Sequence, residues 1–168
     1  HHQAGQLLEA ESVYRQVLTS DRRHFGALHH LGIIALQRGQ AQPAVEAIGR
    51  AIAVDDRVPD CHYNMAFALQ ALGRLSEAAV HYRRAVKLKP DYVEAHTNLG
   101  NVLKALGSHR DAAACYERVI ALKPSAEAHY NLANALSQLG HPDEAVSSYR
   151  RALALKPDLV QGHNNLAN

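Results

Sequence analysis

Residues 93–124 read VEAHTNLGNVLKALGSHRDAAACYERVIALKP. In the first half of this stretch, apolar side chains recur at the spacing of one helix face, from Ala95 to Leu106. Gly107 follows at once, as glycine does just past the C-terminus of a helix, where a positive φ is needed. A second periodic run then ends at Pro124, because proline cannot continue a helix. The stretch therefore predicts two antiparallel helices joined by a glycine turn.

The same pattern recurs along the whole chain of 168 residues. Glycines recur in steps of 34, 34, 34 and 33 residues, at Gly5, Gly39, Gly73, Gly107 and Gly140. A fixed period of this length is typical of a repeat array in which each unit is one helix pair. We expect each of these glycines to end the first helix of a pair. The period predicts an all-α solenoid with an extended surface rather than one central pocket.

The period predicts a single array over residues 1–168, with a partial repeat at 1–24 and the start of a further repeat at 160–168. Four complete repeats are expected between them, at 25–58, 59–92, 93–125 and 126–159. Because the pattern starts and stops in the middle of a repeat, we expect the chain to be a segment of a longer array.

Small and bulky residues occupy fixed positions in the repeats. A small residue stands in the middle of each first helix, at Gly32, Ala66, Gly100, Ala133 and Ala167. A bulky residue stands in each second helix, at Tyr14, Ile48, Tyr82, Tyr116 and Tyr149. Small side chains let two helices approach to roughly 8–10 Å. We expect the bulky residues to fill the gap between one helix pair and the next, with the tyrosine hydroxyls at a polar rim.

Composition narrows the classes of function. The 18 basic and 16 acidic residues give a formal net charge of +2, which favours neither nucleic acid nor an anionic membrane as a partner. Cys61 and Cys115 are too few for a disulfide framework or a zinc knuckle, and they favour a reducing compartment such as the cytoplasm. No apolar run approaches the roughly 18 residues that span a bilayer.

Histidines form a column that invites a metal hypothesis, at His62, His96, His129 and His163. Copies one repeat apart should lie roughly 10 Å from each other, whereas zinc ligands lie about 2 Å from one metal. The sequence also contains no phosphate loop and no nucleophile elbow. We therefore predict no metal, no cofactor and no catalytic residues, so that the chain itself is not an enzyme.

Two further columns are the alanines early in the second helices, at Ala10, Ala44, Ala78, Ala112 and Ala145, and the terminal prolines, at Pro90, Pro124 and Pro157. Together with the small and tyrosine columns they closely resemble those of the tetratricopeptide repeat, a family with this period. The resemblance covers the whole chain. It implies a right-handed α-solenoid of antiparallel helix pairs that acts as a protein-interaction scaffold, with the first helices on the concave side. The departures are local: Arg22 and Asp56 stand where later repeats have proline, and the turn between Pro124 and Asn131 is one residue short.

Asparagines form two columns on the first helices. The first column reads His30, Asn64, Asn98, Asn131 and Asn165, and the second reads Ile33, Phe67, Asn101, Asn134 and Asn168. The i, i+3 spacing puts both columns on one face, which the resemblance places in the groove. An asparagine amide can both donate to and accept from the backbone of an extended peptide. We therefore predict peptide contacts at Asn64, Asn98, Asn101, Asn131, Asn134 and Asn165; the alternative is that these amides bond only between adjacent helices.

The motif Asn-Leu-Gly-Asn at 98–101, with Asn-Leu-Ala-Asn at 131–134 and 165–168, is similar to the asparagine ladder of O-GlcNAc transferase arrays. There the ladder holds protein substrates, so the resemblance implies a substrate-recruiting arm of an O-GlcNAc transferase-like protein. His30 breaks the ladder at its N-terminal end. The alternative function is a structural module that self-associates end to end through its uncapped repeats.

Two other binding modes are disfavoured by the charges. Lys104 is the main cation among the groove positions, and a clamp for a terminal carboxylate would need clustered Lys and Arg. A basic column could suggest RNA, at Arg50, Arg84, Arg118 and Arg151. Acidic residues share those helices, so a solvated, ion-paired face is expected there.

Overall fold

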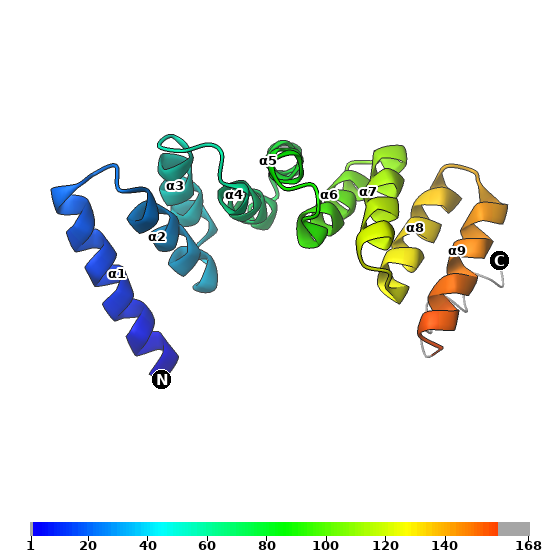
Figure 1. Ribbon diagram of the computed structural model, residues 1–168, viewed down its shortest axis with the longest axis horizontal. Helices are drawn as coiled ribbons and strands as arrows, with labels where there is room; N and C mark the ends of the chain where they lie inside the picture. Colours follow the sequence, from blue (N-terminus) through cyan, green and yellow to red (C-terminus); the bar gives the residue numbers. More distant parts are fainter. Residues whose placement is uncertain (1, 158–168) are drawn as a thin grey trace. The chain divides into compact units, whose positions relative to one another are not determined.

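The computed structural model describes the backbone of residues 2–157 and the side chains from Leu7 onward. This part of the chain contains helices and no strand (Figure 1). The helices are α1 (His2–Ser20), α2 (Phe25–Gln37), α3 (Ala41–Ile52), α4 (Pro59–Ala71), α5 (Leu75–Leu88), α6 (Val93–Ala105), α7 (His109–Leu122), α8 (Ala126–Gln138) and α9 (Pro142–Leu155). The predicted all-α fold is confirmed. Four predicted column positions, His163, Asn165, Ala167 and Asn168, lie outside the described residues.

Contacts between helices divide the chain into two compact units, residues 1–90 and 91–168. In the first unit α2 packs against α3 and α4 against α5, and α3 also contacts α4. In the second unit α6 packs against α7 and α8 against α9, with α7 against α8. The single array over residues 1–168 stays a prediction. No helix in the described part of the chain is long and apolar enough to cross a membrane.

Glycine turns join the two helices of each pair. Gly39, Gly73, Gly107 and Gly140 have φ values of 70°, 73°, 76° and 76°. At the first turn, the Gly39 N–H donates to the Leu36 carbonyl at 2.9 Å, and the Gln40 N–H donates to the Ala35 carbonyl at 2.8 Å. The other three turns repeat this Schellman pattern, which satisfies the last carbonyls of the helix. The prediction that a glycine ends the first helix is confirmed at these four positions.

Gly5 differs from the other glycines of the period. Helix α1 begins at His2 and passes through Gly5, so the prediction that Gly5 ends a helix is wrong. Glycine in the interior of a helix costs only roughly 0.5–1 kcal/mol relative to alanine, which the surrounding residues of α1 tolerate. The backbone therefore continues through Gly5 as one helix.

The bulky residue of a second helix packs on the small residue of its own pair. A Cβ built on Gly100 would lie 2.7 Å from Cε1 of Tyr116, and one built on Gly32 would overlap Cγ1 of Ile48. Both Tyr116 and Ile48 are fully buried. These residues therefore pack within their own pair, and Tyr116 also lines a hollow with Ala128 and Asn131 of the next pair; the expectation that the whole column fills the gap between successive pairs stays a prediction. Tyr14 of α1 instead stacks on His30 of the following helix, with ring centroids 5.1 Å apart.

Candidate functional site

The first asparagine column lies where successive first helices meet. In the first unit, Asn64 of α4 donates from Nδ2 to Nε2 of His29 in α2, at 3.1 Å. In the second unit, Asn131 of α8 is only 9% exposed and lines a hollow of about 240 Å³ together with Thr97 of α6. Asn98 is half-buried on α6. The Asn64 bond is of the kind expected from an asparagine that links adjacent helices.

The second asparagine column is held by buried tyrosines of the same helix pair. Tyr116 donates from Oη to Oδ1 of Asn101 at 2.8 Å, and Tyr149 donates from Oη to Oδ1 of Asn134 at 2.6 Å. Both asparagines remain partly exposed. Each tyrosine therefore fixes which end of its asparagine amide turns toward the core.

The repeat that lacks this asparagine satisfies its tyrosine in another way. Phe67 of α4 occupies the equivalent position and is 47% exposed. Tyr82 donates instead to Oε1 of Gln70 at 3.0 Å. The sequence analysis placed the tyrosine hydroxyls at a polar rim but did not identify these acceptors. A signal was available, because Asn101 and Asn134 each precede their tyrosine by 15 residues.

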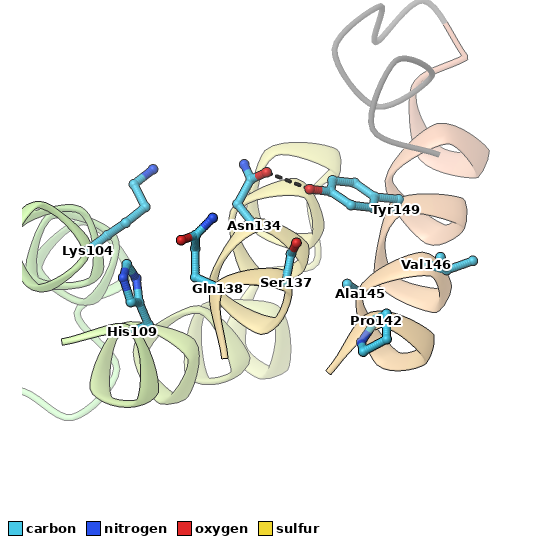
Figure 2. Close-up of a pocket in the computed structure, with 9 residues that line it drawn as sticks. All are labelled: Lys104, His109, Asn134, Ser137, Gln138, Pro142, Ala145, Val146 and Tyr149. Carbon is cyan, nitrogen blue, oxygen red and sulfur yellow. Dashed lines mark hydrogen bonds between the residues drawn. The ribbon is translucent and has the colours of Figure 1, made fainter. Parts of the chain in front are cut away.

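A hollow of about 670 Å³ lies in the second unit, and we call it the Lys104 hollow (Figure 2). Figure 2 shows Lys104 and His109 on one side and Tyr149 on the other, with residues of α8 between them. The lining consists of Lys104, His109, Asn134, Ser137, Gln138, Pro142, Ala145, Val146 and Tyr149. The hollow thus combines one cation with several neutral polar groups, and no carboxylate lines it.

Two groups that line the Lys104 hollow, Nδ1 of His109 and the Lys104 ammonium, have no hydrogen-bond or ion-pair partner within the described part of the chain. Nδ1 of His109 is buried without a hydrogen-bond partner, and Lys104 forms no ion pair there. A buried polar atom in this state calls for a water or a ligand group. Lys104 was predicted from the sequence as the main cation, whereas His109, Ser137 and Gln138 were not predicted. The spacing of Ser137 and Gln138 from Asn134, at i+3 and i+4, was the signal that could have found them.

The histidine column packs inside the helix pairs. His62 is 5% exposed, its Nε2 donates to the Asp56 carbonyl at 2.9 Å, and its Nδ1 lies 3.1 Å from Nδ1 of His81. Because a carbonyl only accepts, the His62 proton sits on Nε2, and His81 donates to Nδ1 of His62. Among the described residues, no three His, Cys, Asp or Glu side chains are placed to hold a metal ion.

Acidification should destabilise the fold through three histidines. Burial is the main cause that lowers the pKa of His29, His81 and His129 below the ordinary value of 6.5. Below pH 6.5 the unfolded chain then binds more protons than the folded chain. The stability that is present above pH 6.5 is therefore lost as the pH falls through the lowered pKa values that these histidines have in the folded chain. We expect a lower urea midpoint at about pH 5.5 than at about pH 7.5. A His81→Gln variant should lose less over this interval; equal losses would contradict the assignment for His81.

Sequence and structure both place the chain among known repeat proteins. A tetratricopeptide repeat model matches residues 2–61 and 97–160, and a TPR repeat model matches residues 68–107. No curated protein sequence matches the chain. A crystal structure of MamA is 25% identical with a TM-score of 0.86, covering 95% of this chain and 94% of its own.

Two further solved structures share the fold at lower identity. YrrB, described as a TPR protein with an unusual peptide-binding site, is 20% identical with a TM-score of 0.90, covering 99% of this chain and 87% of its own. A MamA structure from Desulfovibrio magneticus RS-1 is 23% identical with a TM-score of 0.75, covering 94% of this chain and 81% of its own. These likenesses agree with the helix pairs described above.

Proposed function

The chain belongs to the tetratricopeptide repeat family, and we propose that it binds an extended segment of another protein along its first helices. The observation that carries the proposal is the Lys104 hollow, where side chains of α6, α7 and α8 converge. YrrB, which is similar in fold, is described as having a peptide-binding site. This description supports a peptide as the kind of ligand.

The spacing of the helices suits such a ligand. Adjacent first helices lie roughly 10 Å apart, and an extended chain advances roughly 3.3 Å per residue. Each repeat would therefore meet the ligand at about every third residue. The six predicted contact residues, Asn64, Asn98, Asn101, Asn131, Asn134 and Asn165, stay proposed contacts. Asn101 and Asn134 are the better placed, since both are partly exposed, whereas Asn131 is 9% exposed.

A pair of double variants tests the proposal. We expect Asn101→Ala with Asn134→Ala to weaken peptide binding about tenfold, because each amide offers one or two hydrogen bonds to the ligand backbone. Fluorescence anisotropy with a library of short labelled peptides measures the affinity, and the tightest binder serves as the probe.

The matched control is Asn98→Ala with Asn131→Ala, which changes the first column in the same two helices. This control should lower the melting temperature, because Asn131 is buried. It should weaken peptide binding less than the Asn101 and Asn134 variant does. The proposal fails if no peptide in the library binds the unmodified protein, or if the Asn101 and Asn134 variant binds as tightly as that protein does.

A narrower role is a substrate-recruiting arm of an O-GlcNAc transferase-like protein. This role rests on the Asn-Leu-x-Asn motif alone, and the similar structures reported above add no support to it. A glycosyltransferase domain encoded after Asn168 would support it. The chain itself is proposed to act without catalysis. A cytoplasmic location and the lack of nucleic-acid or membrane partners stay predictions.

Self-association is the second candidate function. Helix α1 exposes two large apolar residues, Leu8 at 61% and Val13 at 53%, which a second copy of the chain could cover. Light scattering against concentration separates this candidate from the scaffold, since a persistent monomer argues against assembly.

A further inference from the structure

We propose that the Lys104 hollow binds the carboxylate of an acidic side chain, aspartate or glutamate, within the extended segment. This inference rests on the proposed function and names the chemistry of one ligand position. It follows from the charges that line the hollow, the unsatisfied polar groups in it and its place along α8.

The charges in the hollow favour an anion. Lys104 is the one residue of fixed charge in the lining, and it has no ion-pair partner within the described chain. A neutral ligand would leave this ammonium without a partner, and a basic ligand would be repelled. A carboxylate would form a charge-assisted hydrogen bond with it, which is roughly twice as strong as a neutral one.

Three other hollows in the described part of the chain differ from this one because each contains a carboxylate. Glu127 accompanies Lys123 in the hollow beside Asn131. In the first unit, Glu11 bonds to both Arg15 and Arg38, so these two arginines already have an anionic partner. A carboxylate also lines the hollow formed by α9 residues, where Asp143 lies with Arg150 and Arg151. The absence of an acid is therefore a feature of the Lys104 hollow and does not extend to these surfaces.

Neutral polar groups complete the site. His109 brings a buried Nδ1 that lacks a partner, and Gln138 and Ser137 bring an amide and a hydroxyl. Tyr149 draws Oδ1 of Asn134 toward itself at 2.6 Å, so this oxygen faces the tyrosine rather than Lys104 (Figure 2). The Asn134 oxygen is therefore held by Tyr149 and does not face a carboxylate bound beside Lys104.

The place of the hollow along α8 indicates a side chain rather than the end of the ligand. A helix rises 1.5 Å per residue, so Gln138 lies roughly 6 Å beyond Asn134 along the axis. A segment that crosses the first helices has its backbone beside Asn134 and continues on both sides. Its side chain, projecting along the axis, then reaches Ser137, Gln138 and the flexible Lys104 ammonium.

Peptides that differ at one position test the inference. The probes are short peptides of alternating alanine and serine, acetylated and amidated, with glutamate, glutamine or lysine at the centre. We expect the glutamate peptide to bind about fivefold more tightly than the glutamine peptide, and the lysine peptide to bind most weakly. The preference for glutamate should shrink at about 0.5 M salt, because salt screens charges at an open site.

The decisive variant is Lys104→Met, with Lys123→Met as the matched control. Lys104→Met should bind the glutamate and glutamine peptides equally and keep the unfolding midpoint, because Lys104 has no described ion pair to lose. Lys123→Met should keep the preference for glutamate. If all peptides bind the unmodified protein equally, the carboxylate site is wrong while the scaffold stands. If no peptide binds, both fail.

Discussion

Replacing Tyr116 by alanine will lower the free energy of unfolding of the second unit by about 3–5 kcal/mol. Tyr116 is fully buried, its ring lies against Gly100, and its hydroxyl donates to Oδ1 of Asn101 at 2.8 Å. The substitution removes this packing and leaves a cavity between α6 and α7. It also takes a hydrogen-bond donor from Asn101, which adds to the loss.

Tyr116→Phe is the control for the alanine variant, because it keeps the ring and removes only the hydroxyl. It should cost about 1 kcal/mol, the net contribution of one hydrogen bond. Urea unfolding followed by circular dichroism measures both variants. If the alanine variant is no less stable than the phenylalanine variant, the ring does not carry the packing of this helix pair.

Replacing Gly32 by leucine will destabilise the first unit by about 1–3 kcal/mol or more. Any Cβ at Gly32 overlaps the side chain of Ile48, which is fully buried. Alanine is accepted at the equivalent positions, Ala66 and Ala133, so a small side chain can be absorbed by a slight separation of the helices. A leucine side chain requires α2 and α3 to move apart.

Gly49→Ala is the matched control in the same unit, and its effect should have the opposite sign. A Cβ at Gly49 meets the flexible end of Met65 at 3.4 Å, which is an ordinary contact. Alanine should therefore stabilise α3 by about 0.5–1 kcal/mol through its helix propensity. Thermal unfolding of both variants measures the two effects. If both variants lose stability, the close contact between α2 and α3 is not the reason that position 32 requires a glycine.

The fold was predictable because its signals are local. Gly39 stands just after a periodic apolar run, and a positive φ at this point needs only the preceding turn of helix. Gly5 is the same residue type at the same period, yet it lies inside α1. The period alone therefore did not determine a turn.

The candidate site was predictable only in part, because its bonds join residues from different helices. The spacing showed that Asn64 and Asn131 share a face of the first helices, but it could not show that Asn64 reaches His29 across a helix contact. His109 has no counterpart in the other repeats, since the equivalent positions hold Ala41, Leu75 and Pro142. An analysis by columns finds residues that recur, and it passes over a histidine that occurs once.

The different hydrogen-bond partner of Tyr82 has a consequence for how substitutions can alter the outward-facing residues of one repeat. Its hydroxyl bonds to Gln70 when position 67 holds phenylalanine, whereas Tyr116 and Tyr149 use an asparagine at that position. The core tyrosine therefore does not dictate the residue that faces outward at this point of the first helix. One repeat can present an apolar ring and the next an amide over the same buried framework. New binding preferences can thus arise by single substitutions in one repeat while the helix packing is inherited unchanged.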